Sequence, residues 1–284
     1  MASNRPTAIF LSPHLDDIAL SCGGMATRLS KMGARCIGVT VCAAPSPPNE
    51  ILSSFAEMLH GQWESASGSD IEAINEVRRR EEQAALKLLG LEAVWLDVPD
   101  AIYRRGSAGE YFYDSEEGIF GKVASEERRL LVPHITEEIR RVALESGAKG
   151  RVRVFAPLGV GNHVDHQLLF WAARRLGPRY GVLFYEDYPY ASKPGALQAR
   201  LENLQLPAQP RLVPITEQIG IKIAAISRYK SQLDILFGGS EAMPAEVRAY
   251  GHSVAGGSGE GRYAERFWHI PTVYSVTSVS ALYW

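Results

Sequence analysis

A short apolar run near the N-terminus ends in a cluster of polar side chains, and this succession limits the folds open to the chain. Residues 8–11 (Ala-Ile-Phe-Leu) have the length and apolar character of a buried strand, and residues 12–17 (Ser-Pro-His-Leu-Asp-Asp) follow directly. Apolar and small residues then recur at helical spacing from Ile18 to Met32, so the polar cluster lies in a strand-to-helix turn. In an open α/β sheet such a turn lies at the carboxyl end of a strand, where ligands usually bind. The motif therefore predicts an α/β fold with a polar site at that edge of the sheet.

Helix capping is a simpler explanation for the two carboxylates of this turn. Aspartate is a preferred N-cap residue and suits the positive end of a helix, so Asp16 or Asp17 could serve only that purpose. A second cluster, residues 159–166 (Gly-Val-Gly-Asn-His-Val-Asp-His), favours another interpretation, because it also follows a β-branched run and precedes a helical pattern. Two histidine-and-carboxylate clusters at the ends of two strands can meet over one sheet edge. A shared metal site is therefore the better hypothesis.

The two clusters also match a known family. Pro-His-x-Asp-Asp at residues 13–17, together with His-x-Asp-His at residues 163–166, resembles the PIG-L/LmbE family of zinc-dependent N-deacetylases. The resemblance extends to Arg78-x-x-Glu81, to residues 97–101 (Asp-Val-Pro-Asp-Ala) and to residues 186–190 (Glu-Asp-Tyr-Pro-Tyr), and so spans most of the chain. It implies an enzyme that removes the acetyl group from N-acetylglucosamine-type sugars, which occur in glycolipids, thiol cofactor precursors and glycopeptide antibiotics.

The resemblance implies a metal site with three protein ligands. In the family pattern the ligands fall on His14, Asp17 and His166, which bind one Zn²⁺ per chain, with another divalent metal as an alternative. Zinc in hydrolases typically takes three protein ligands and leaves one position for water, and this set of nitrogen and oxygen donors suits it.

The same resemblance implies the catalytic groups. Asp16 would be the general base that takes the proton of the attacking water. Amide hydrolysis also needs stabilisation of the tetrahedral oxyanion, and His163, if cationic, could supply part of it beside the metal. Asp165 is expected to orient His163 or His166, with a plain helix cap as the alternative. Asp187 is expected either beside a ligand or on the rim of the site.

Two further residues match positions that contact sugar hydroxyls in the family. These are Arg78 and Asp100, for which a helix-surface ion pair and a turn aspartate are the alternatives. The chain departs from the thiol-precursor branch, because Gly161 and Asn162 precede His163 and no aromatic hydroxyl stands there. This departure argues against an oxyanion scheme assisted by a tyrosine at that position.

The rest of the sequence continues the alternation of strands and helices. Residues 34–43 predict a second strand, so the first unit is strand, helix, strand, with a right-handed crossover and a parallel sheet. Further strands are expected at 94–96, 152–155 and 182–185, helices at 71–89, 125–144, 167–176 and 193–204, an extended segment at 207–215 and a long helix at 217–236. Residues 44–70 and 101–123 are expected to be loop insertions that form pocket walls, the first with a short helix near residues 51–59. We expect a Rossmann-like three-layer α/β/α fold with a mainly parallel sheet, in a single PIG-L/LmbE-like domain over residues 1–284.

The composition and charge of the chain limit the kinds of binding partner and the cellular compartment that we expect. A formal net charge of −2 over 284 residues gives no electrostatic footprint for nucleic acid. No apolar run reaches the length of a transmembrane helix, and the N-terminus lacks the apolar core of a signal peptide. Cys22, Cys36 and Cys42 lack metal-binding spacing and argue for a reducing compartment. We therefore expect a cytoplasmic protein whose partner is a small-molecule N-acetylated sugar conjugate, with no nucleic acid and no integral membrane segment. Whether it forms a homo-oligomer is left open.

Two other classes compete with the deacetylase interpretation. Clusters of aspartate and histidine also bind two metal ions in metallophosphoesterases, although ligands for a second ion are not evident in this sequence. A non-catalytic Rossmann-like binding protein is the other alternative. Against nucleotide binding, Gly23 and Gly24 fall inside the first predicted helix, too late to cradle a pyrophosphate. Close packing is the expected reason for these glycines, because glycine in a helix costs about 1 kcal/mol relative to alanine.

Overall fold

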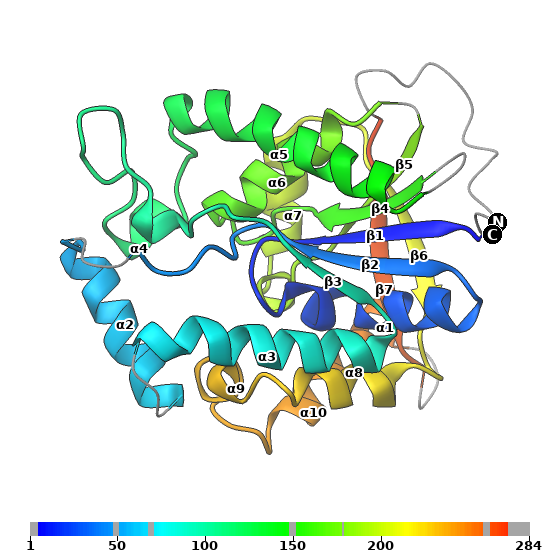
Figure 1. The fold of residues 1–284 in the computed structure, drawn as a ribbon. Coiled ribbons are helices and arrows are strands. Elements are labelled where there is room, and N and C mark those ends of the chain that lie inside the picture. Colours follow the sequence, from blue (N-terminus) through cyan, green and yellow to red (C-terminus); the bar gives the residue numbers. More distant parts are fainter. Residues whose placement is uncertain are drawn as a thin grey trace.

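The computed structural model describes residues 5–47, 51–67, 71–147, 152–177, 179–257 and 262–271. Within them, seven strands form one sheet in the order β3-β2-β1-β4-β5-β7-β6 (Figure 1). The strands are β1 (Thr7–Ser12), β2 (Arg35–Thr40), β3 (Glu92–Trp95), β4 (Val152–Pro157), β5 (Tyr180–Tyr185), β6 (Gln209–Pro214) and β7 (Ala264–His269). The first five run parallel, and β7 pairs antiparallel with both β5 and β6. The expected mainly parallel sheet is confirmed.

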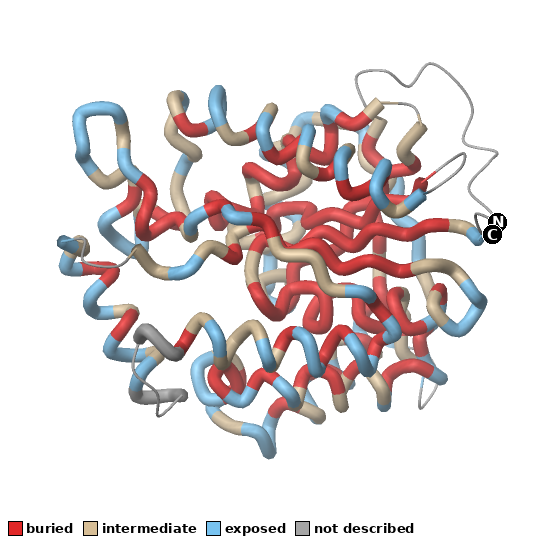
Figure 2. The backbone as a smooth tube through the Cα atoms, viewed as in Figure 1, coloured by how far each residue is buried: buried red, intermediate tan, exposed pale blue. Residues whose placement is uncertain are grey.

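Helices cover both faces of this sheet and complete the expected three layers (Figure 1). One face carries α1 (Asp17–Lys31), α3 (Ile71–Leu89), α8 (Ile219–Ile226), α9 (Lys230–Phe237) and α10 (Met243–Val254), and the other carries α5 (Ser125–Glu145), α6 (Val164–Arg174) and α7 (Ala196–Leu204). The central strands are buried throughout, as strands covered on both faces must be (Figure 2). No helix in the described part of the chain is long and apolar enough to cross a membrane.

The two insertions are more ordered than the sequence predicts. The first holds α2 (Ser54–Ser67), longer than the expected helix, and the second holds the short helices η1 (Ala101–Tyr103) and α4 (Glu116–Ile119). Their apolar side chains form a separate small core, in which Phe55, Tyr113 and Ile119 are buried together with Val164 of α6. The insertions therefore support each other beside the start of α6.

The expected long helix over residues 217–236 is wrong, because the chain forms two helices there, α8 and α9. The break falls at Tyr229, whose backbone angles of φ −83° and ψ 60° are not helical. Its ring is buried, and its hydroxyl donates a hydrogen bond to the buried carboxyl of Glu82. The turn that buries this side chain interrupts the helical pattern. The antiparallel strand β7 is an addition that the sequence pattern does not predict.

Helix α1 is broken near its middle, and β7 stabilises the break. Cys22 has non-helical angles of φ −136° and ψ 19°, so the second half of α1 starts anew. The Glu265 carboxylate accepts hydrogen bonds from the backbone N–H groups of Gly24 (2.9 Å) and Met25 (2.8 Å), as a capping side chain would. Lys222 of α8 pairs with the same carboxylate at 2.7 Å. The buried Glu265 carboxylate thus connects α1, whose first residue is Asp17, to β7 and to α8.

The expected close packing at Gly24 is confirmed, and it generates a first prediction. A Cβ at Gly24 would lie 2.6–2.9 Å from three side-chain atoms of the buried Ile215. We expect Gly24→Ala to lower the free energy of unfolding, because overpacking costs about 1–3 kcal/mol and exceeds the roughly 1 kcal/mol that alanine gains in a helix. Urea unfolding measures the change.

Gly220 of α8 is the matched control, because a Cβ there would meet nothing within 4 Å. Gly220→Ala should leave the protein as stable as wild type or up to about 1 kcal/mol more stable. A Gly24→Ala protein that behaves like Gly220→Ala would contradict the packing argument.

Candidate functional site

The site lies where the winding of the sheet changes direction. From β1 the chain builds β2 and β3 on one side, and it later builds β4 and β5 on the other side of β1. The turns after β1, β4 and β5 therefore lie at neighbouring carboxyl ends of parallel strands, the place where α/β sheets bind ligands. These turns carry His14 to Asp17, His163 to His166, and Asp187.

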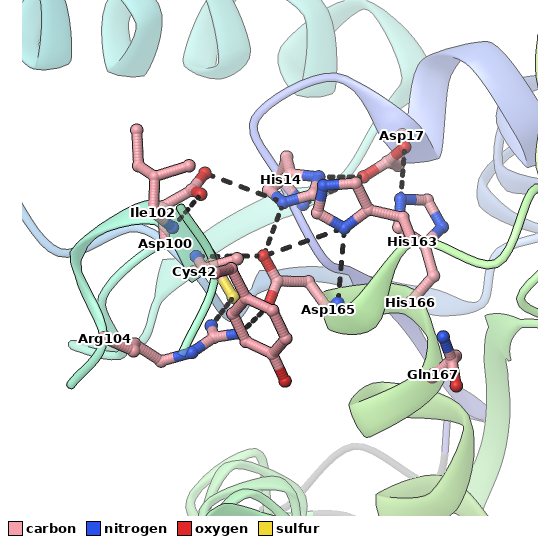
Figure 3. Close-up of polar contacts among 12 residues, drawn as sticks. His14, Asp17, Cys42, Asp100, Ile102, Arg104, His163, Asp165, His166 and Gln167 are labelled. Atoms are coloured by element: carbon pink, nitrogen blue, oxygen red, sulfur yellow. Dashed lines mark hydrogen bonds and ion pairs between the residues drawn. The ribbon is translucent and has the colours of Figure 1, made fainter. Parts of the chain in front are cut away.

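The structure brings His14, Asp17 and His166 together. One donor atom of each lies within 4.8 Å of the donor atoms of the other two. An oxygen of Asp17 accepts a hydrogen bond from the backbone N–H of His14 (2.9 Å) and lies 3.5 Å from its Nδ1, and the other oxygen lies 3.6 Å from His166 Nε2 (Figure 3). The two clusters of the sequence thus form one site.

A carboxylate holds the far nitrogen of each histidine. His14 Nε2 lies 3.0 Å from Asp165, and His166 Nδ1 lies 2.6 Å from Asp187. The other oxygen of Asp187 accepts the backbone N–H groups of Gly159 and Val160, both at 2.8 Å. His14 Nδ1 and His166 Nε2 are left on the side of Asp17. This carboxylate–histidine pattern is the one that orients histidine ligands on metals.

The donor set fits a divalent metal ion. His166 Nε2 is buried and has no hydrogen-bond partner within the described residues, which is costly unless something else satisfies it. Two imidazole nitrogens and one carboxylate are the protein ligands that catalytic zinc sites use. His14, His163 and Asp165 form a second group of the same kind. In that group Asp165 is already engaged by His14 and by Arg104 (2.5 Å), so the first group is the better metal site.

Asp16 is next to these ligands but does not cap the helix. It occupies the N-cap position of α1, yet its side chain makes no capping hydrogen bond. It is only 7% exposed and lines the adjoining cavity, with Arg78 Nη2 4.0 Å from its carboxylate. Burial, reinforced by the charge of Asp17, raises the pKa of Asp16 to about 7. The capping explanation for Asp16 is therefore not supported.

His163 is buried at the N-terminus of α6, and burial disfavours the charged form of its ring. Its Nδ1 accepts a hydrogen bond from the backbone N–H of Asp165 (3.3 Å), which leaves the proton on Nε2. Burial and then the charge of His14 lower the pKa of His163 well below its ordinary value. The structure thus places His163 in the site, where burial and this hydrogen bond favour a neutral N–H donor over the cation that its expected role requires.

The Asp165 carboxylate lies 3.9 Å from Nδ1 of His163, one of its two expected partners, but its closest histidine contact is with His14, at 3.0 Å. His166, the other expected partner, is held by Asp187 instead. The far oxygen of Asp165 pairs with Arg104 of the second insertion, whose guanidinium also pairs with the buried Glu127. Sequence reasoning missed Arg104 and Glu127. The sequence gives no clear signal for either residue, because an arginine in a predicted loop and a glutamate in a predicted helix usually lie on the surface.

A cavity of about 420 Å³ opens beside the cluster. It is walled by both insertions and by α9, and its lining includes Phe55, Met58, Leu59, Trp63, Glu116, Ile119, Phe120, Tyr190, Ile235 and Leu236. Phe120 and Tyr190 stand edge-on to each other, and Phe120 stands edge-on to His163 as well. The expectation that residues 44–70 and 101–123 wall the pocket is therefore consistent with the described parts of both segments.

Arg78 and Asp100 both line this cavity. The Arg78 guanidinium lies 5.7 Å from the Trp63 ring, and its Nε is buried without a hydrogen-bond partner in the described residues. Asp100 caps η1 by accepting the backbone N–H of Ile102 (3.3 Å), and its other oxygen lies 3.7 Å from His14 Nε2. Both side chains are thus placed to meet a ligand, although Asp100 also fulfils the turn role that was its alternative.

Comparison with known proteins agrees with this geometry. Residues 9–177 match the model of the PIG-L family, described as GlcNAc-PI de-N-acetylase. A 2'-N-acetylparomamine deacetylase of Niallia circulans is 33% identical over 84% of this chain and 85% of its own, and one of Streptomyces fradiae is 31% identical over 68% and 61%. Among solved structures, the zinc-inhibited form of teicoplanin deacetylase has the same fold, with a TM-score of 0.76 and 24% identity over 93% of this chain and 98% of that one.

The buried contact between Asp187 and His166 generates a prediction about metal affinity. We expect Asp187→Asn to weaken zinc binding by about 10–100-fold, because the amide is a poorer acceptor and no longer fixes His166 Nε2 toward Asp17. His166→Ala and Asp17→Ala should bind still more weakly, since each removes a ligand. Competition with a chromophoric chelator gives the dissociation constants.

Glu186 is the adjacent carboxylate and serves as the control. It pairs with Arg266 and Trp268 rather than with a histidine of the site. Glu186→Gln should leave zinc affinity within about twofold of wild type, since the site keeps all its ligands. Equal affinity in Asp187→Asn and wild type would contradict the orienting role.

Metal binding should also depend on pH. The neighbouring Asp165 and Asp17 raise the pKa of His14 well above its ordinary value although burial opposes them, and Asp17 and Asp187 raise the pKa of His166 in the same way. A raised pKa keeps the proton on the ring to higher pH, and zinc must displace it. We expect zinc affinity to fall as pH falls, by roughly tenfold per pH unit for each proton released.

Titration calorimetry in two buffers of different ionisation enthalpy counts the released protons. His163→Gln is the control, because a neutral His163 has no proton to release and the count at pH 7 should not change. Zinc affinity that is independent of pH, with no protons released, would contradict these protonation states.

Proposed function

This chain belongs to the PIG-L family of GlcNAc-PI de-N-acetylases, and from this we propose that it is a metal-dependent hydrolase that removes the acetyl group from an N-acetylated amino sugar. The observation that carries the proposal is the cluster of His14, Asp17 and His166, with the carboxylate of Asp16, which does not cap the helix, beside it. The two 2'-N-acetylparomamine deacetylases support an amino-sugar conjugate as the substrate class.

We propose zinc as the metal, at one ion per chain. His14 Nδ1, Asp17 and His166 Nε2 would hold it, because the remaining nitrogens of these two histidines are engaged by Asp165 and Asp187. When bound, the ion supplies a Lewis acid that polarises the acetyl carbonyl and lowers the pKa of water. A metallophosphoesterase with two ions is disfavoured, since the second candidate group shares His14 with the first and its one carboxylate, Asp165, is neutralised by Arg104.

Asp16 acts as the general base in this proposal. Its carboxylate faces the cavity next to the ligands, takes the proton of the attacking water and can pass it toward the leaving amine. Burial and Asp17 raise the pKa of Asp16 to about 7 in the metal-free protein, which suits a group that accepts and returns a proton near neutral pH. Arg78, at 4.0 Å, fixes the direction of the carboxylate.

His163 donates a hydrogen bond from Nε2 to the reacting amide. Its neutral ring is held by the backbone N–H of Asp165 on one side and by the edge contact with Phe120 on the other. A neutral donor in a buried site still stabilises developing negative charge, because the local dielectric is low. This role replaces the cationic one expected from the sequence.

The substrate side of the cavity combines polar and aromatic groups. Arg78 and Asp100 would bind sugar hydroxyls, and Trp63 and Phe120 offer apolar surfaces to the faces of sugar rings. A volume of about 420 Å³ falls within the range of small-molecule sites, roughly 300–1,000 Å³. Acetate release from a panel of N-acetylated amino sugars, with 2'-N-acetylparomamine and simple N-acetylglucosaminides among them, tests the proposal directly, and phosphate esters serve as the negative arm.

The adjacent aspartates give a sharper test. Asp16→Asn keeps the volume of the side chain and the three metal ligands but cannot accept the water proton, so kcat should fall by about 10²–10⁴-fold with zinc content unchanged. Stopped assays of acetate together with metal analysis of the same sample measure both quantities.

Asp17→Asn is the matched variant. It should lose zinc affinity, and added zinc should restore part of its activity, whereas the same addition should not rescue Asp16→Asn. Near-normal turnover in Asp16→Asn would contradict the general-base role.

A further inference from the structure

A second hollow lies between α5 and α6. It is a groove of about 400 Å³ and shares no lining residue with the catalytic cavity. Arg128 and Arg129 of α5 line it on one side, and Arg174 and Arg175, at the end of α6, line it on the other. None of its lining residues is acidic. Four positive charges therefore gather in one concave place on a chain whose formal net charge is −2.

Within the part of the chain that the structure describes, none of these four arginines is paired with a carboxylate. No described carboxylate lies within 4.0 Å of any of them in an ion pair. Farther along the same helix, Arg140 pairs with Glu137, and Arg141 pairs with Glu138 (2.5 Å) and Glu145 (3.1 Å). Arg140 and Arg141 of α5 are thus paired with carboxylates, whereas Arg128 and Arg129 at the groove form no ion pair with a described residue.

Trp171 fixes two of the guanidinium groups in place. Arg128 lies 4.3 Å from the centre of its ring and Arg174 lies 5.4 Å from it, distances typical of cation–π contacts. Rings that hold guanidinium groups in fixed positions reduce the entropy that a ligand must remove on binding.

Arg174 is a buried charge with unfilled hydrogen-bonding capacity. It is only 9% exposed, and its Nε has no partner in the described residues. Its Nη2 donates to the carbonyl of Pro271 (3.2 Å), a neutral acceptor. A buried guanidinium is costly unless a counter-charge neutralises it. None of the described residues supplies one to Arg174, and an anion in the groove would.

We propose that this groove binds a phosphate-bearing small ligand, with a diphosphate as the matching chemistry. Guanidinium groups bind phosphate oxygens through paired N–H donors, and several of them around one hollow suit an anion with several charges. The concave shape, with Val132 among the lining residues, favours a small ligand over a flat macromolecular surface.

Titration calorimetry of the zinc-loaded full-length protein with sodium pyrophosphate tests the proposal. We expect one binding event that weakens with added salt, and a loss of affinity of at least about 10-fold in the double variant Arg128→Gln/Arg175→Gln. Both side chains are exposed and lie outside the catalytic cavity, so deacetylase turnover should stay at the wild-type level and report that the variant is folded.

Arg140→Gln/Arg141→Gln is the matched control. It removes the same number of positive charges from α5, at residues that do not line the groove, and it should bind pyrophosphate like wild type. Equal binding in wild type and both double variants would place the anion at the catalytic metal and overturn the proposal. No binding at millimolar pyrophosphate, or binding only to anionic lipid vesicles, would also overturn it. Comparison of pyrophosphate with ADP then tells whether the phosphate is recognised alone or on a nucleotide.

Discussion

Two contacts between a carboxylate and an imidazole, Asp165 with His14 and Asp187 with His166, determine the geometry of the site. Each contact uses one ring nitrogen and so determines which nitrogen remains for Asp17 and a metal ion. The contacts also join separate parts of the fold, because His14 follows β1, Asp165 and His166 lie in α6, and Asp187 follows β5. Without them the same five side chains would still lie at one sheet edge, but their donor atoms would not converge.

Further hydrogen bonds and an ion pair to Asp187 and Asp165 stabilise these two contacts. Asp187 accepts two backbone N–H groups from the turn after β4, so the carboxylate that orients His166 also fixes the loop that leads to it. On the other side, Arg104 neutralises Asp165 and anchors the second insertion to the histidine–aspartate cluster. The wall of the adjoining cavity and the geometry of the proposed metal ligands are thus stabilised by one network. Substitutions in the second insertion that move Arg104 are therefore expected to alter the geometry of the histidines and aspartates of the site.

Much of this arrangement could be predicted from the sequence. Strand ends followed by histidines and aspartates located the site, because parallel strands bring their carboxyl ends to one edge, and Gly24 was correctly assigned to close packing. The closest histidine to the Asp165 carboxylate could not be predicted, since His163 and His166 lie near it in sequence, whereas His14 comes close to it only because β1 pairs with β4. Arg104 was missed for a related reason: its importance comes from burial beside Asp165, which the composition of a loop does not reveal. The break at Tyr229 likewise depends on a distant partner.

Anomalous diffraction at the zinc edge, from crystals of the zinc-loaded protein, tests the central claim most directly. We predict one ion, bound by His14 Nδ1, by an oxygen of Asp17 and by His166 Nε2, with Asp16 facing the ion from outside its ligand set. Zinc bound through His14 Nε2 together with His163 and Asp165, or zinc ligated directly by Asp16, would contradict that claim.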